Sequence, residues 1–114
     1  MMQLRTGLME QTLTRLCRAS EIPEGGVKQV SIPALEAEYA VFKLAGEYFV
    51  TEDMCTHGMV SLSQGEVEDG QIICPLHGGA FDIRTGRATE RPCRVALKTF
   101  KAVVIGDELH AELG

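Results

Sequence analysis

Two short stretches of the sequence contain metal-binding side chains: Cys55-Thr56-His57 and Cys74-Pro75-Leu76-His77, which are separated by sixteen residues. Each stretch places one thiol and one imidazole close together in the chain, and both groups are ligands of transition metals. Together the two stretches supply two sulfur and two nitrogen ligands. We therefore predict one metal centre held by four side chains: Cys55, His57, Cys74 and His77.

The order of these ligands distinguishes between the metal centres that such a set can hold. In one class of [2Fe–2S] cluster, two Cys hold one iron and two His hold the other. Cys55 and Cys74 would then bind one iron, and the two His would bind the second. Structural zinc sites also use two Cys and two His, but zinc fingers pair Cys with Cys and His with His. We predict a [2Fe–2S] cluster that transfers one electron at a time, with a structural zinc site as the alternative.

The two remaining cysteines, Cys17 and Cys93, are predicted to be packed thiols rather than ligands or disulfide partners. Cys17 lies in a segment of alternating apolar and polar residues, and Cys93 follows Arg91-Pro92 at the expected start of a strand. Neither has a His close by in the chain. Free cysteines are among the most buried residue types, and disulfides belong to oxidising compartments.

Length and charge predict a small carrier without nucleic-acid or membrane partners. The 114 residues suit a single domain over residues 1–114, with residues 1–11 as a flexible N-terminal extension. The net charge is −5, and we identify no basic cluster of the kind that binds nucleic acid or anionic membranes. The sequence has no apolar run long enough to span a bilayer and no secretory signal. We expect a cytoplasmic monomer.

Short alternating segments separated by turn residues indicate an all-β fold. Ala45-Gly46 predicts a two-residue hairpin turn, residues 68–70 predict a second hairpin, and Thr85-Gly86 predicts a third. Residues 8–16 are also compatible with the start of a short helix. Glycines become frequent between Met54 and Pro92, as expected where the backbone wraps closely around a cofactor. The expected strands span residues 13–18, 27–32, 38–44, 47–51, 71–73, 95–98, 99–105 and 109–112.

The stretches Cys55-Thr56-His57-Gly58 and Cys74-Pro75-Leu76-His77-Gly78 resemble the two ligand boxes of Rieske-type ferredoxins, in particular the ferredoxin components of bacterial aromatic-ring-hydroxylating dioxygenase systems. The resemblance implies a small antiparallel β-sandwich, barrel-like, with a loop-rich cluster-binding subdomain over residues from about 53 to 92. It implies one Rieske [2Fe–2S] cluster per chain. It also implies electron transfer from a flavin-containing NAD(P)H-dependent reductase to a terminal Rieske oxygenase, with the two His at the exposed edge of the cluster.

Four positions differ from the respiratory and photosynthetic members of that family. Those proteins have a disulfide between the two ligand loops, and the matching residues here are Val60 and Leu76. They also place a serine and a tyrosine hydroxyl beside the cluster, where this chain has Gly79 and Phe81. Hydrogen-bond donors stabilise a reduced cluster and raise its potential. We therefore expect an unbridged cluster of low reduction potential.

The sequence leaves several alternative functions to consider. A catalytic Rieske oxygenase would need a second iron site, and only His110 remains once the four ligands are assigned. A ferredoxin serving a monooxygenase, the small subunit of a nitrite reductase, and a β-rich interaction domain are the further alternatives. Acidic residues are expected to form either a solvated face or a surface that steers partners. They are Glu47, Glu52, Asp53, Glu66, Glu68 and Asp69.

Overall fold

A computed structural model describes residues 13–56, 59–76 and 78–113, and its strands form three antiparallel sheets. The all-β prediction is therefore confirmed. The predicted N-terminal extension, residues 1–11, lies outside the described residues. In the part of the chain that the structure describes, no helix is long and apolar enough to cross a membrane. Three short 3-10 helices accompany the strands: η1 (Ala19–Glu21), η2 (Pro33–Leu35) and η3 (Leu62–Gln64).

The middle sheet has the strand order β10-β5-β4-β3. Its central strand, β4 (Ala37–Leu44), pairs with β3 (Val27–Ile32) on one side and with β5 (Glu47–Glu52) on the other. The short strand β10 (Thr99–Phe100) completes the sheet beside β5. Successive side chains of a strand point to opposite faces, and β4 buries four in succession. The middle sheet is therefore covered on both faces.

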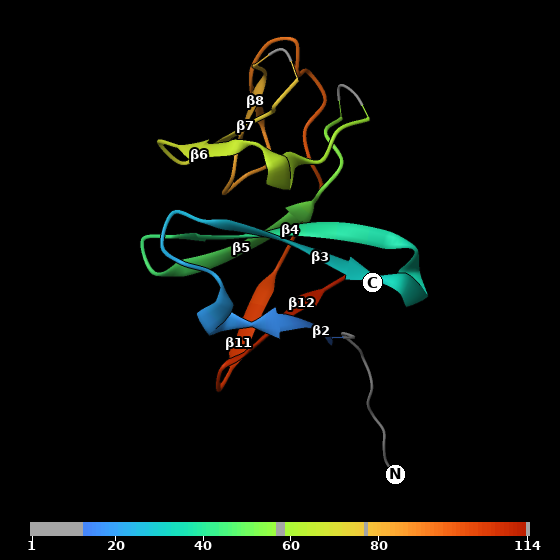
Figure 1. Cartoon of the computed structure of the whole chain (residues 1–114), viewed down its shortest axis with the longest axis vertical. Helices are drawn as coiled ribbons and strands as arrows, with labels where there is room; N and C mark the ends of the chain where they lie inside the picture. Colours follow the sequence, from blue (N-terminus) through green and yellow to red (C-terminus); the bar gives the residue numbers. More distant parts are fainter. Residues whose placement is uncertain (1–12, 57–58, 77, 114) are drawn as a thin grey trace.

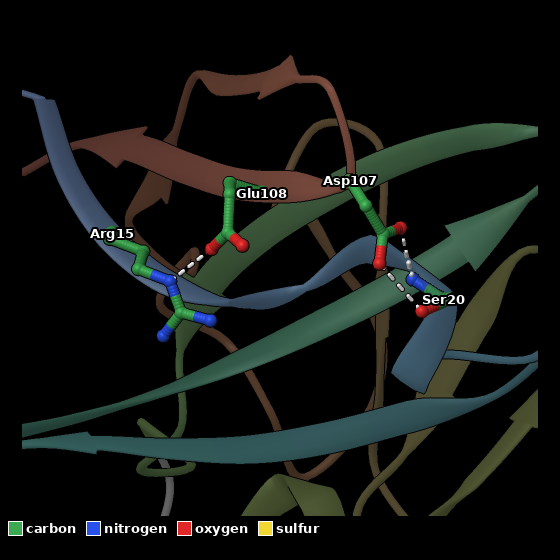
Figure 2. Close-up of polar contacts among 4 residues, drawn as sticks. All are labelled: Arg15, Ser20, Asp107 and Glu108. Atoms are coloured by element: carbon green, nitrogen blue, oxygen red, sulfur yellow. Dashed lines mark hydrogen bonds and ion pairs between the residues drawn. The ribbon is translucent and has the colours of Figure 1, made fainter.

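One face of the middle sheet is covered by a second sheet of order β11-β12-β2, which we call the lower sheet (Figure 1). Its strands are β11 (Ala102–Ile105), β12 (Glu108–Glu112) and β2 (Leu13–Arg18). Polar contacts join the turn between β11 and β12 to the end of β2. The Asp107 carboxylate accepts hydrogen bonds from the backbone N–H and the hydroxyl of Ser20, at 3.1 and 2.8 Å, and Glu108 pairs with Arg15 (Figure 2).

The other face is covered by a small sheet of order β6-β7-β8-β9, which follows the first ligand box in the chain (Figure 1). Its strands are β6 (Glu66–Glu68), β7 (Gln71–Ile73), β8 (Ala80–Asp82) and β9 (Ala88–Glu90). Asp69 and Gly70 connect β6 to β7 with φ of 52° and 77°. Positive φ at both central residues is the geometry of a tight hairpin turn and explains the Asp-Gly pair.

Two hydrophobic cores result, one on each face of β4. Tyr39 and Val41 pack with Leu109 in the core shared with the lower sheet. Ala40 and Phe42 belong to the other core, next to the small sheet. Three of the four cysteines also lie in this second core: Cys55, Cys74 and Cys93. The predicted ligand cysteines are therefore placed where the small sheet meets the middle sheet.

The structure corrects three local expectations. Residues 95–98 form no strand, because Leu97 and Lys98 hydrogen-bond to Gly86 and Glu52 while the chain crosses from the small sheet to the middle sheet. Residues 99–105 form two strands in different sheets, β10 and β11, instead of one. Residues 13–16, the described part of the suggested helix, are strand because β2 pairs with β12.

Candidate metal centre

The first ligand loop begins directly after β5, where Cys55 is 2% exposed. The Cys55 N–H donates to the carbonyl of Val60 at 2.9 Å, and Met54 forms a β-bridge with Ser61. These contacts close the loop that carries the first box, so its two ends are held together below the ligands.

A buried carboxylate anchors the start of the same loop. Asp53 is 2% exposed and has no cationic partner among the described residues. Its carboxylate accepts hydrogen bonds from Gln29 Nε2 at 2.7 Å, from the Ser63 N–H at 2.9 Å and from the Ser61 hydroxyl. A buried charge is tolerated only where such bonds compensate its lost hydration. The expectation that Asp53 belongs to an exposed acidic face is therefore wrong.

The second ligand loop connects β7 to β8 and is closed in the same way. The Cys74 N–H donates to the carbonyl of Gly79 at 2.6 Å, and Ile73 pairs with Ala80 next to it. In each loop the ligand cysteine thus donates to the carbonyl five residues further on. The two loops are therefore closed by matching hydrogen bonds, and each contributes a cysteine to the same core.

The sulfur atoms of the two boxes belong to a buried, thiol-rich region of that core. Cys74 is 1% exposed, and burial raises the pKa of its thiol, while a hydrogen bond from the Leu76 backbone N–H acts in the opposite direction. N–H donors of this kind stabilise a metal-bound thiolate. Two buried cysteines on two closed loops, with a backbone donor to sulfur, fit the sulfur half of a [2Fe–2S] site. His57 and His77, the predicted nitrogen half, lie outside the described residues.

Cys93 contributes a third sulfur atom to this region of the core, and the sequence did not predict its proximity to Cys55 and Cys74. Its Sγ lies 3.8 Å from Cys55 Sγ, and it is not on a strand but in the segment that follows β9. Burial, reinforced by Cys55 and Cys74, raises the pKa of Cys93 to about 12. The predicted burial is confirmed for both Cys93 and Cys17, and Cys17 lies in the core of the lower sheet.

Four positions were expected to differ from family members that have a disulfide between the ligand loops: Val60, Leu76, Gly79 and Phe81. All four cysteines are free. Val60 packs against the core, whereas the Leu76 side chain is partly exposed. Phe81 is fully buried, and Gly79 lies against Cys93. No side-chain hydroxyl is present at residues 79 and 81.

Comparison with known proteins identifies the family and agrees with the fold. The family model of the Rieske [2Fe–2S] domain matches residues 12–101. The chain is 37% identical over 102 residues to ferredoxin CarAc of Metapseudomonas resinovorans, covering 90% of this chain and 94% of that protein. It is 36% identical over 103 residues to the ferredoxin component of the p-cumate 2,3-dioxygenase system of Pseudomonas putida, covering 90% and 86%.

A solved structure agrees with these relatives. It is described as a complex of reduced oxygenase and oxidized ferredoxin in carbazole 1,9a-dioxygenase. One chain of it matches with a TM-score of 0.83 and 36% identity, covering 90% of this chain and 94% of that chain. Sequence and fold thus agree over nearly the whole length, and the chain belongs to the Rieske [2Fe–2S] domain family.

Proposed function

We propose that this protein is a one-electron carrier that passes electrons from a flavin-containing NAD(P)H-dependent reductase to the terminal oxygenase of an aromatic-ring-hydroxylating dioxygenase system. The observation that carries the proposal is full-length similarity, at 36–37% identity, to ferredoxin components of such systems. The bound cluster supplies a reversible one-electron couple, and the chain contributes the ligands and their surroundings. The protein is then a component of a multicomponent oxygenase, without a reaction of its own on the aromatic compound.

Within this proposal, the cluster is held by Cys55 and Cys74 on one iron and by His57 and His77 on the other. Equivalent closure of the two cysteine-bearing loops and burial of both sulfurs support the assignment. We infer that residues from about 53 to 92 act as the cluster-binding subdomain of the single domain 1–114. The small sheet, β6 to β9, lies within those bounds. A monomer in the cytoplasm is the expected state.

Exposed apolar side chains around the ligand boxes support a docking surface at this end of the molecule. Met59 is 90% exposed, Val95 is 65% exposed, and Met54 and Leu76 are also exposed. All four lie in or beside the ligand loops, and Val95 is joined to the first loop because its carbonyl accepts a hydrogen bond from Thr56 Oγ1 at 2.6 Å. Exposed apolar groups that gather near one site indicate a protein interface. We place partner docking here.

Acidic and basic residues occupy different parts of the small sheet and its flanking segments. The edge at β6 carries Glu66 and Glu68, followed by Asp69 in the turn. The edge strand β9 lies within residues 84–98, a stretch that contains five basic residues and one acidic residue. Arg87, Arg91 and Arg94 are exposed and form no ion pair within the described ranges. These arginines lie close together in the chain, and acidic and basic groups at different places on one surface can orient a partner during encounter.

Spectroscopy of the purified protein tests the carrier function. We expect a brown protein with iron and acid-labile sulfide in equal amounts, a rhombic electron paramagnetic resonance signal after reduction, and a titration that fits one electron. A colourless protein that binds one zinc ion would contradict the proposal. Partner assignment is tested by stopped-flow mixing with a purified flavin-containing ferredoxin reductase and with a purified terminal oxygenase of an aromatic-ring-hydroxylating dioxygenase system. Reduction by the first and oxidation by the second, each faster than with bovine serum albumin as the control partner, is the expected result.

A further inference from the structure

Cys93 lies beside the predicted cluster ligands without belonging to either ligand box. Its Sγ is 3.8 Å from Cys55 Sγ, a distance at which a thiol can donate a hydrogen bond to sulfur. The side chain is 4% exposed and packs in the same core as Cys55 and Cys74. Water is therefore largely excluded from competing for this contact.

Three features of the surrounding structure position the segment that carries Cys93 next to the ligand loops. Its backbone N–H donates to the Glu90 carbonyl at 3.1 Å. On the opposite side, Gly79 leaves open the volume that the sulfur occupies, because a Cβ at residue 79 would lie 2.4 Å from Cys93 Sγ. The segment continues to Val95, whose carbonyl is bound by Thr56 of the first ligand loop. These contacts fix the backbone around Cys93, and Gly79 leaves room for its sulfur beside Cys55.

Metal binding at Cys55 would determine which of the two sulfur atoms donates the hydrogen bond and which accepts it. In the free thiols either atom can donate, but a cysteine that coordinates a metal loses its proton. Cys55 can then only accept, and Cys93 is the partner that still carries a proton. A donor to a cluster sulfur stabilises the more negative, reduced state and so raises the reduction potential.

We propose that Cys93 is a positioning residue that tunes the cluster by donating an S–H···S hydrogen bond to Cys55. The proposal rests on the proposed function in so far as Cys55 must hold the iron. It adds a residue from outside both ligand boxes to the set that determines the reduction potential. It also means that the segment after β9 contributes to the electronic properties of the site, in addition to its packing.

The test compares Cys93→Ala, Cys93→Ser and Cys17→Ala with the unchanged protein, all loaded with the cluster. Cys17 provides a matched control because it is also 4% exposed but packs in the other core. We expect a lower reduction potential in Cys93→Ala, a potential close to that of the unchanged protein in Cys93→Ser, where a hydroxyl can donate, and no shift in Cys17→Ala. In the resonance Raman spectrum, loss of the hydrogen bond should move the iron–cysteine stretching band of Cys93→Ala to higher frequency.

Other results would overturn the proposal. An unchanged potential in Cys93→Ala, or equal shifts in the Ala and Ser variants, would mean that the thiol only fills space. If Cys93→Ala does not hold the cluster, Cys93→Val, which fills the space without a donor, is compared with Cys93→Ser. A lower potential and a smaller deuterium-oxide shift of the iron–cysteine band in the Val variant support the proposal. Equal values in the two variants, or loss of the cluster from both, contradict it. Failure of the proposed function would be recognised separately, because the unchanged protein would then contain no [2Fe–2S] cluster.

Discussion

Gly79 and Cys93 are in direct contact: a Cβ atom built on Gly79 would lie 2.4 Å from Cys93 Sγ and 3.2 Å from the Cys93 backbone nitrogen. The first distance is far below an ordinary carbon–sulfur contact. Gly79 also closes the second ligand loop through its carbonyl, which accepts the Cys74 N–H. The residue types at positions 79 and 93 therefore depend on each other, and both affect the geometry of the metal centre.

Gly79→Ala should destabilise the protein, because the added methyl group has no room beside the Cys93 sulfur. Overpacking of a buried site costs about 1–3 kcal/mol. Cys93→Ala removes the sulfur, so the double variant should recover part of this loss. Urea unfolding of the two single variants and the double variant measures the coupling, which for residues in contact is about 0.5–3 kcal/mol. Strictly additive effects would mean that the two side chains do not compete for the same space.

Replacing a predicted ligand should remove the cluster. We expect Cys55→Ser, Cys74→Ser, His57→Ala and His77→Ala to lose the visible spectrum and most of the bound iron. Because metal binding and folding are coupled, the small sheet should also lose protection against amide hydrogen exchange. Iron and sulfide analysis measures the loss, with Cys17→Ala as the control that retains colour. Full cluster content in either His variant would show that the ligand assignment is incorrect.

The reduction potential should lie near the low end of the Rieske range, which spans about −150 to +300 mV. Gly79 has no side chain and the buried Phe81 has no hydroxyl, so neither side chain can donate a hydrogen bond to the cluster. A dye-mediated redox titration measures the value. A potential well above zero would contradict this expectation and would indicate donors stronger than Cys93 and the Leu76 backbone N–H.

Asp53→Asn should destabilise the first ligand loop. The carboxylate accepts bonds from Gln29 Nε2, the Ser61 hydroxyl and the Ser63 N–H. An asparagine can replace only part of this set, because its NH₂ group would face another donor. A buried donor left without a partner costs about 1–3 kcal/mol. Urea unfolding and the rate of cluster loss both measure the effect, and Glu66→Gln, at an exposed position, is the matched control. Equal stability of the two variants would contradict a structural role for Asp53.

Small charged redox reagents should reveal whether the acidic residues of β6 and the arginines that follow β9 affect the rate of electron transfer. We expect the double variant Glu66→Lys with Glu68→Lys to slow oxidation of the reduced protein by the cation hexaammineruthenium(III). The double variant Arg91→Glu with Arg94→Glu should slow oxidation by the anion ferricyanide. Both effects should be severalfold at low salt and diminish as salt screens the charges. Stopped-flow rates that do not change, with intact cluster spectra, would exclude steering by these residues.

The class of metal centre and most of the strands can be predicted from short stretches of sequence. Two Cys-and-His boxes specify a mixed sulfur and nitrogen ligand set, because the side chains that bind metal lie next to each other in the chain. Alternation and turn residues predicted β2 and β3, and the Ala45-Gly46 turn predicted the hairpin of β4 and β5. These features are local, since strand alternation and tight turns depend on neighbouring residues.

Contacts between residues far apart in the chain depend on how the sheets pack. Cys93 was expected to be an unrelated packed thiol, and its approach to Cys55, 38 residues away, depends on the packing of the segment after β9 against two ligand loops. Asp53 was grouped with exposed acids until Gln29 of β3 proved to be its partner. The division of residues 99–105 between two sheets likewise depends on which strand edges were free. Contacts between distant segments leave no periodic signal in the sequence. The residues that surround the predicted ligands, such as Cys93 and Asp53, can therefore be identified only in the folded chain.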